Sequence, residues 1–246
     1  MEKETGITFL FGTNLATLLA QKISVVHPSF DQKKFIRAVS KNIADKTLLQ
    51  RVLLIAEQLN HFLPAEYPKA VDIIIRILGP ENEKETGMFT NFYWQMPLSK
   101  FIEMYGLENF EVSMKAIEEI TKRNTGEYAI RPYVRKYPAK TLRQMKKWAA
   151  SKNFHLRRLA SEGLRPKLPW ASKLDLFIEQ PAPVFAILDT LKEDPVRFVK
   201  KSVANHINDY IKVNPAAAHE LIGNWRKSRN EHTQWIIRHA TRNLKD

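Results

Sequence analysis

The chain has 246 residues, with 39 Lys or Arg against 26 Asp or Glu, a net charge of +13 and no cysteine. This length can bury a sizeable core in one large domain or two small ones, and the absence of cysteine excludes disulfides and thiolate metal ligands and suits a reducing cytosol. Only eight glycines are present, which disfavours a Gly-rich β protein or a phosphate loop, and no apolar run approaches the roughly 18 residues that a membrane span requires.

Apolar residues recur with the helical period of about 3.6 along nearly the whole chain, and alternation with period 2 is nearly absent. We therefore predict an all-α fold. The dipeptide Gly79-Pro80 is a strong helix stop, and the polar segment 80–93 after it is the best loop candidate. Helices are expected over 8–22, 30–43, 48–63, 71–78, 98–104, 110–120, 127–136, 139–150, 153–162, 172–179, 182–192, 195–211, 215–227 and 230–243.

Three of the later expected helices resemble one another. They align on Phe154, Phe198 and Gln234, with spacings of 44 and 36 residues, and segment 127–131 resembles the same element. Such spacing is typical of two-helix HEAT-like repeats, whose stacked pairs curl into a solenoid with a concave face. We expect a single HEAT-like repeat domain over 1–246. The aligned helices also share a small residue at one later step, namely Ala160, Ala204 and Ala240.

The positive charge is concentrated in one block. Residues 122–173 hold 15 Lys or Arg and only two acids, Glu127 and Glu162, so this block carries the whole net charge of +13. Such a field implies a polyanionic partner, most simply nucleic acid. The charge is spread over several expected helices and their turns, so we do not expect a membrane surface to be the partner.

The aligned helices each place cations at or near the same step, so stacking them would build a basic ladder along one surface. The alternative is that these residues only solubilise an outer face. The scarcity of acids in the central block favours the ladder. The cations are Arg157, Arg158, Lys200, Lys201 and Arg238.

The densest segment follows the expected helix 153–162, which Gly163 is expected to end as its C′ residue. Arg165, Lys167 and Trp170 then fall in a loop stiffened by prolines. Cations, exposed backbone and an aromatic ring suit a loop that grips phosphate and stacks on a base. For Trp170 alone, a plug between repeats is an equal alternative.

The absence of several motifs excludes the chemistries that depend on them. The chain has no Gly-rich phosphate loop, no HExxH and no GxSxG, and its seven histidines show no metal-ligand spacing, so we expect no metal and no cofactor. Glu127 and Glu162 lie four residues from Arg131 and Arg158. Both could be helix-surface ion pairs. The functional alternative is that carboxylates in a DNA-binding surface face a developing positive charge or orient a water.

The chain resembles the AlkC-type alkylpurine DNA glycosylases, relatives of AlkD in the HEAT-like DNA alkylation repair superfamily. The resemblance runs over nearly the whole chain, and its most specific motif is Leu-Arg-Arg-Leu-Ala-Ser-Glu-Gly-Leu-Arg-Pro-Lys-Leu-Pro-Trp at 156–170. The other motifs lie at 27–35, 97–107, 126–133 and 199–209.

The resemblance implies a bacterial cytoplasmic enzyme that hydrolyses the N-glycosidic bond of cationic alkylpurines, chiefly 3-methyladenine, in duplex DNA. It implies a monofunctional reaction without a metal, a cofactor or ordinary base flipping. It assigns Glu127 and Glu162 as active-site carboxylates, with Arg158 orienting Glu162 or holding a phosphate. Because the chain ends after a helix at Asp246, we expect the form without a C-terminal immunoglobulin-like domain.

The later repeats are expected to add phosphate contacts to those of Arg131, Arg157 and the 163–170 loop. For Asn205 and His206, hydrogen bonding between repeats is the alternative to a DNA contact. A solenoid that wraps one duplex needs no partner subunit, so we expect a monomer. Two other functions stay open: a catalytically silent relative that binds alkylated or branched DNA, and a scaffold whose basic face meets an acidic protein. The residues of the later repeats that are expected to contact phosphate are Lys200, Lys201, Asn205, His206 and Arg238.

Overall fold

The computed structural model describes residues 6–87 and 91–244, and over these ranges the chain is all-helical, which confirms the predicted fold class. The chain divides into two compact units. The first comprises residues 1–82 and 87–125, and the second comprises residues 83–86 and 126–246. The expectation of a single domain over 1–246 stays a prediction.

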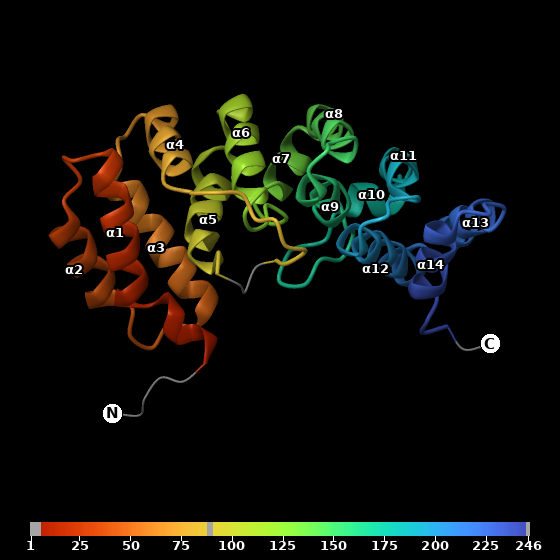
Figure 1. Ribbon diagram of the computed structural model, residues 1–246, viewed down its shortest axis with the longest axis horizontal. Helices are drawn as coiled ribbons and strands as arrows, with labels where there is room; N and C mark the ends of the chain where they lie inside the picture. The colour runs from red at the N-terminus through yellow and green to blue at the C-terminus, as the bar shows by residue number, and fades with distance from the viewer. Residues whose placement is uncertain (1–5, 88–90, 245–246) are drawn as a thin grey trace. The chain divides into compact units, whose positions relative to one another are not determined.

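The first unit is built from antiparallel helix pairs (Figure 1) around an apolar core. Leu15, Leu19 and Ile23 are fully buried on one face of the first helix, at the spacing that a 3.6-residue period places together. Phe35 and Phe62 add an edge-to-face ring contact at 5.8 Å between centroids. The helices are α1 Thr13–Val26, α2 Gln32–Asn42, α3 Leu48–Phe62, α4 Tyr67–Arg76, α5 Met96–Tyr105 and α6 Phe110–Thr121, with 3-10 turns at Ile7–Phe11 and Tyr93–Gln95.

The second unit holds α7 Arg131–Lys136, α8 Pro138–Ala149, α9 Phe154–Glu162, α10 Asp175–Glu179, α11 Ala182–Leu191, α12 Arg197–Val213, α13 Pro215–Trp225 and α14 Glu231–Ala240. Here α8/α9, α11/α12 and α13/α14 form successive pairs, and the second helices of the pairs, α9, α12 and α14, pack in a row (Figure 1). This is the HEAT-like repeat arrangement.

The sequence repeat corresponds to that row of helices. Ala160, Ala204 and Ala240 are all fully buried, because a small side chain at this step lets neighbouring helices approach closely. The helix starts also repeat. Asn153 accepts a hydrogen bond from the backbone N–H of His155, and Asn230 accepts one from His232, each at 2.9 Å. The helices are therefore equivalent, but the caps lie seven residues before Ala160 and ten residues before Ala240, so the helix starts do not confirm the residue-by-residue alignment.

The helix boundaries differ from the prediction at a few places. The helix expected over 127–136 begins only at Arg131, with Pro132 in its first turn, because proline suits a helix start and lacks the N–H that an interior position needs. Residues 127–130 form the turn before it. The helix expected over 8–22 is a 3-10 turn followed by α1, separated by Gly12 in an extended conformation. The predicted loop 80–93 is irregular as far as residue 87, and its residues 88–90 lie outside the described ranges.

Candidate active site

Glu162 is the last residue of α9, and its position is fixed by close packing at Gly163. A Cβ atom at Gly163 would lie 2.8 Å from Ile130 Cγ2 and 3.0 Å from Met145 Cε, so a larger residue would force these neighbours or the helix end to shift. The backbone of Gly163 is right-handed, with φ −67°. Glycine is required here by space and not by the left-handed conformation usual at a C′ position.

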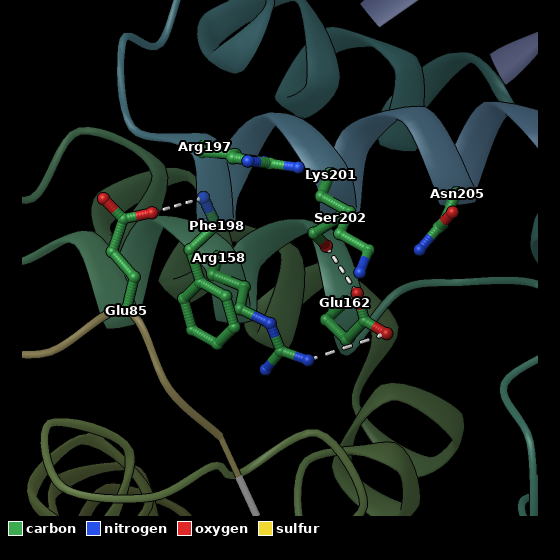
Figure 2. A pocket seen from close by; sticks show the side chains of 8 residues that line it. All are labelled: Glu85, Arg158, Glu162, Arg197, Phe198, Lys201, Ser202 and Asn205. Carbon is green, nitrogen blue, oxygen red and sulfur yellow. Dashed lines mark hydrogen bonds and ion pairs between the residues drawn. The ribbon is translucent and has the colours of Figure 1, made fainter. Parts of the chain in front are cut away.

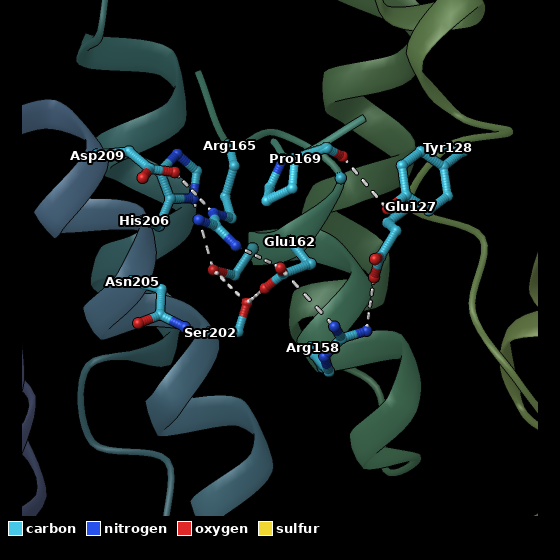
Figure 3. Close-up of polar contacts among 12 residues, drawn as sticks. Glu127, Tyr128, Arg158, Glu162, Arg165, Pro169, Ser202, Asn205, His206 and Asp209 are labelled. Carbon is cyan, nitrogen blue, oxygen red and sulfur yellow. Dashed lines mark hydrogen bonds and ion pairs between the residues drawn. The ribbon is translucent and has the colours of Figure 1, made fainter. Parts of the chain in front are cut away.

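The carboxylate of Glu162 is buried, with 6% of the residue exposed, and it is held from three sides (Figure 3). Ser202 Oγ on α12 donates to Oε2 at 2.6 Å, and Arg165 Nη1 donates to Oε1 at 2.7 Å. Arg158 Nη2 lies 3.8 Å from Oε1. Charge-assisted hydrogen bonds of this length are strong, so the carboxylate has one defined orientation.

Glu127 lies in the turn before α7 and pairs with a cation far along the sequence. Its Oε2 accepts a hydrogen bond of 2.8 Å from Arg158 Nη1. Arg158 thus stands between the two acids, and its guanidinium lies 4.6 Å from the ring centroid of Phe198, a cation–π distance. The structure brings together all three residues that the sequence assigned to catalysis (Figure 3).

A third acid, which the sequence analysis missed, completes this group. Asp209 on α12 accepts a hydrogen bond of 2.7 Å from Arg165 Nε. Ionic groups therefore alternate in sign along a chain of contacts, which we call the charge chain: Glu127, Arg158, Glu162, Arg165 and Asp209. Ser202 and Asp209 both fall in the motif at 199–209, so this motif was the sequence signal that could have identified them.

The electrostatics differ along the charge chain. Burial alone would raise the pKa of Glu162, but the charges of Arg158 and Arg165 and the hydrogen bond from Ser202 outweigh it and hold that pKa below its usual value. Burial raises the pKa of Asp209, although the bond from Arg165 opposes the shift. The pKa values of the two carboxyl groups are therefore shifted in opposite directions.

Glu162, Arg158 and Ser202 line a pocket of about 380 Å³ (Figure 2). Its remaining wall comes from Glu85, Arg197, Phe198, Lys201 and Asn205. Arg197 and Lys201 are exposed cations on α12, and the backbone N–H of Phe198 donates to the Glu85 carboxylate at 2.9 Å. The pocket thus presents a fixed carboxylate below a rim that is mainly cationic.

The loop after α9 presents Trp170 outward. Trp170 is 65% exposed, with φ +60°, so it is not a plug in the core. Tyr128 Oη donates to the Pro169 carbonyl at 3.3 Å. Beneath the loop, Arg131 donates to the carbonyls of Arg165 and Ser172 at 2.9 and 2.5 Å. Lys167, in the same loop, is exposed.

Two residues expected to contact DNA are internal, which corrects that expectation. Arg131 is 2% exposed; it anchors the loop, and burial lowers its pKa to about 10. His206 is fully buried, stacks on Tyr210 and has its Nδ1 3.5 Å from Ser161 Oγ. It therefore takes the inter-repeat role, and burial together with the charge of Arg165 lowers its pKa to about 3. Neither side chain offers surface to a phosphate.

The ladder cations divide into exposed and engaged residues. Lys201 and Arg238 are exposed, and Asn205 is half-buried beside the pocket. Arg157 Nε donates to Asp194 at 2.5 Å, and Lys200 Nζ lies 5.4 Å from the ring centroid of Trp235. Arg197, an exposed cation on the pocket rim, was not among the predicted residues.

Among residues 6–87 and 91–244, no three or more His, Asp or Glu side chains gather in a way that could hold a metal ion. Within the same ranges, no helix combines the length and the apolar character needed to cross a bilayer.

The fold and the site define a class: helical-repeat proteins with a fixed carboxylate in a pocket rimmed by cations. The model of the family described as DNA alkylation repair enzyme matches residues 106–244. A Bacillus subtilis (strain 168) relative, described as uncharacterized protein YhaZ, is 33% identical over 236 residues, which are 96% of this chain and 63% of that protein. The chain belongs to the DNA alkylation repair enzyme family, as the motifs indicated.

A solved structure is similar over the same extent. The Pseudomonas fluorescens alkylpurine DNA glycosylase AlkC, bound to DNA containing an abasic site analog, has a TM-score of 0.86 and 31% sequence identity, with 98% of this chain and 65% of AlkC covered. The chain therefore spans slightly less than two thirds of the length of either relative.

Proposed function

We propose that the protein is a monofunctional DNA glycosylase that hydrolyses the N-glycosidic bond of cationic alkylpurines in duplex DNA, with 3-methyladenine as the first substrate. The observation that carries the proposal is the Glu162 carboxylate, buried and fixed by Ser202 and Arg165 in the wall of a pocket with a cationic rim. Membership of the DNA alkylation repair family and the similarity to AlkC support it.

The reaction needs little help from the enzyme in releasing the purine base, because the alkylated purine is already a good leaving group. When C1′–N breaks, the bonding electrons neutralise the positive charge of the alkylated purine, which leaves as a neutral base. Positive charge then develops on the sugar as an oxocarbenium ion. A water adds to C1′ and loses a proton, leaving an abasic site. A preorganised anion beside C1′ stabilises this transition state.

Glu162 is proposed as that anion, because it lines the pocket and its pKa is held low. A carboxylate that stays ionised in a buried position acts on the sugar charge in a medium of low dielectric, where the interaction is strong. Glu127 is proposed to hold Arg158 in place and, with it, to position the attacking water. Arg158 then either orients Glu162 or contacts the phosphate beside the lesion.

Duplex DNA is the proposed partner, and the protein is proposed to act as a monomer in the bacterial cytoplasm. Exposed cations around the pocket supply phosphate contacts, and Trp170 supplies a ring for stacking. Recognition through the charge of the lesion would not require ordinary base flipping. The contacting residues are proposed to be Lys167, Trp170, Arg197, Lys200, Lys201, Asn205 and Arg238, with Arg157 and Arg165 contributing positive potential.

The test is to incubate the protein with methylated genomic DNA and identify the released bases by chromatography. We expect 3-methyladenine in the soluble fraction and abasic sites in the DNA. A protein that binds duplex but releases no base would be a silent relative instead. Phosphate contacts release counterions, so the constant for binding to duplex DNA should fall as salt is added. A duplex-binding constant that does not change with salt would argue against DNA and for an acidic protein as the partner.

A further inference from the structure

The charge chain presents an electrostatic problem that its third acid solves. Glu162 lies between two guanidinium groups, with Arg165 at 2.7 Å and Arg158 at 3.8 Å. Two cations beside one carboxylate would leave that group of three with a positive charge. A site of that sign would repel the oxocarbenium ion it is meant to stabilise.

Acids at both ends of the charge chain reverse the sign of its net charge. Glu127 pairs with Arg158 at 2.8 Å, and Asp209 pairs with Arg165 at 2.7 Å. With every member ionised, three carboxylates face two guanidinium groups, a net charge of −1. Each arginine then shares its charge between two acids, and Glu162 keeps part of its negative potential for the pocket.

The geometry also makes Asp209 a support for the orientation of Glu162. Ser202 and Asp209 lie seven residues apart on α12, which is about two helical turns, so both project from one face of the helix. Ser202 contacts Glu162 directly, and Asp209 contacts it through Arg165, whose Nε and Nη1 bond the two acids (Figure 3). With Asp209 7% exposed, the support is largely shielded from water.

We propose that Asp209 is a positioning residue for the glycosylase reaction: by binding Arg165 it keeps Glu162 oriented and keeps the net charge of the charge chain negative. This inference rests on the proposed function and adds to it a residue that acts without touching DNA. It predicts that loss of the Asp209 charge weakens the preference of the site for a positively charged sugar.

The experiment compares two duplexes that differ at one position, one with a pyrrolidine sugar analogue, which is cationic, and one with a neutral tetrahydrofuran. The wild-type protein should bind the cationic duplex more tightly. Asp209→Asn should reduce the ratio of the two affinities about tenfold, while binding of the neutral duplex changes less than about threefold. Asp209→Glu, which keeps the charge, should restore much of the ratio. An unchanged ratio in Asp209→Asn would overturn the proposal.

Two further variants separate charge balance from loss of structure. Arg165→Gln combined with Asp209→Asn removes one charge of each sign, so its ratio should return toward the wild-type value even if Asp209→Asn alone is unstable. Asp175→Asn, at an exposed acid in the same unit, should leave the ratio unchanged. If the double variant stays as poor as Asp209→Asn, charge balance is not the role of Asp209.

The proposed function can fail separately from this inference. If the wild-type protein releases no alkylpurine and shows no preference for the cationic duplex, both fail. If it releases alkylpurines but the ratio does not depend on Asp209, only the positioning role fails.

Discussion

Ser202 Oγ donates a hydrogen bond of 2.6 Å to Glu162 Oε2, linking α12 to the end of α9. The serine belongs to a different repeat from the glutamate, 40 residues along the chain. The orientation of the proposed catalytic carboxylate therefore depends on how two successive repeats stack. A pocket at such a junction is built from the same contacts that hold the repeats together.

The first prediction concerns that hydrogen bond. Ser202→Ala should reduce single-turnover release of 3-methyladenine about tenfold, because Glu162 loses a donor that fixes it and favours its ionised form. Duplex affinity should change little, since Ser202 is 3% exposed. The control is Ser24→Ala, where the hydroxyl bonds a backbone carbonyl of α1; it should keep full activity. Equal activity of both variants would refute the role of Ser202.

Replacing Trp170 with glycine should have different effects on the stability of the protein and on its affinity for duplex DNA. Its φ of +60° favours glycine, so Trp170→Gly should leave the free energy of unfolding unchanged or raise it by up to about 1 kcal/mol. Duplex affinity should fall by about 1–3 kcal/mol, the value of one base–aromatic stack. Urea denaturation and fluorescence anisotropy measure the two effects. Undiminished affinity would remove Trp170 from the DNA interface.

Arg131 should matter for folding. Arg131→Met removes donors to the carbonyls of Gly163, Arg165 and Ser172, and should lower the free energy of unfolding by about 2–4 kcal/mol. Arg135→Met is the control, because Arg135 is exposed and also donates to Ser172; it should cost less than about 1 kcal/mol. Similar losses in the two variants, measured by urea denaturation, would contradict a special role for the buried guanidinium.

His206 predicts a pH dependence of stability. Its pKa is lowered from 6.5 to about 3 in the fold, so the unfolded chain binds the proton more readily. The contribution of neutral His206 is complete above pH 6.5 and is lost as the pH falls, at up to about 1.4 kcal/mol per pH unit. Between pH 6.5 and 5, His206→Phe should lose about 2 kcal/mol less than the wild type. Parallel stability curves would contradict this.

Local sequence patterns predicted the helices and the repeat, because helical periodicity and a small residue at each packing step are properties of short segments. They did not predict that Glu127 would pair with Arg158, or that Asp209 would bind Arg165. These partners lie 31 and 44 residues apart, so only the stacking of repeats brings them together.

Burial also explains why two polar residues do not have the phosphate contacts that we expected. Arg131 and His206 carry side chains that usually face water, and their types favoured phosphate contact. In the fold, the Arg131 guanidinium donates to carbonyl groups, and His206 stacks on a tyrosine ring. A sequence shows which side chains can bind phosphate, but it does not show which of them the fold uses internally.

The most direct test of the account is single-turnover release of 3-methyladenine by Glu162→Gln, measured beside the wild type and the control Glu179→Gln, an exposed acid of α10. Removing the fixed anion should slow release at least about a hundredfold, in line with loss of one preorganised charge-stabilising group. Duplex affinity should be kept or slightly raised, because a negative charge has gone from a DNA-binding surface. Release at the wild-type rate by Glu162→Gln would contradict the central claim.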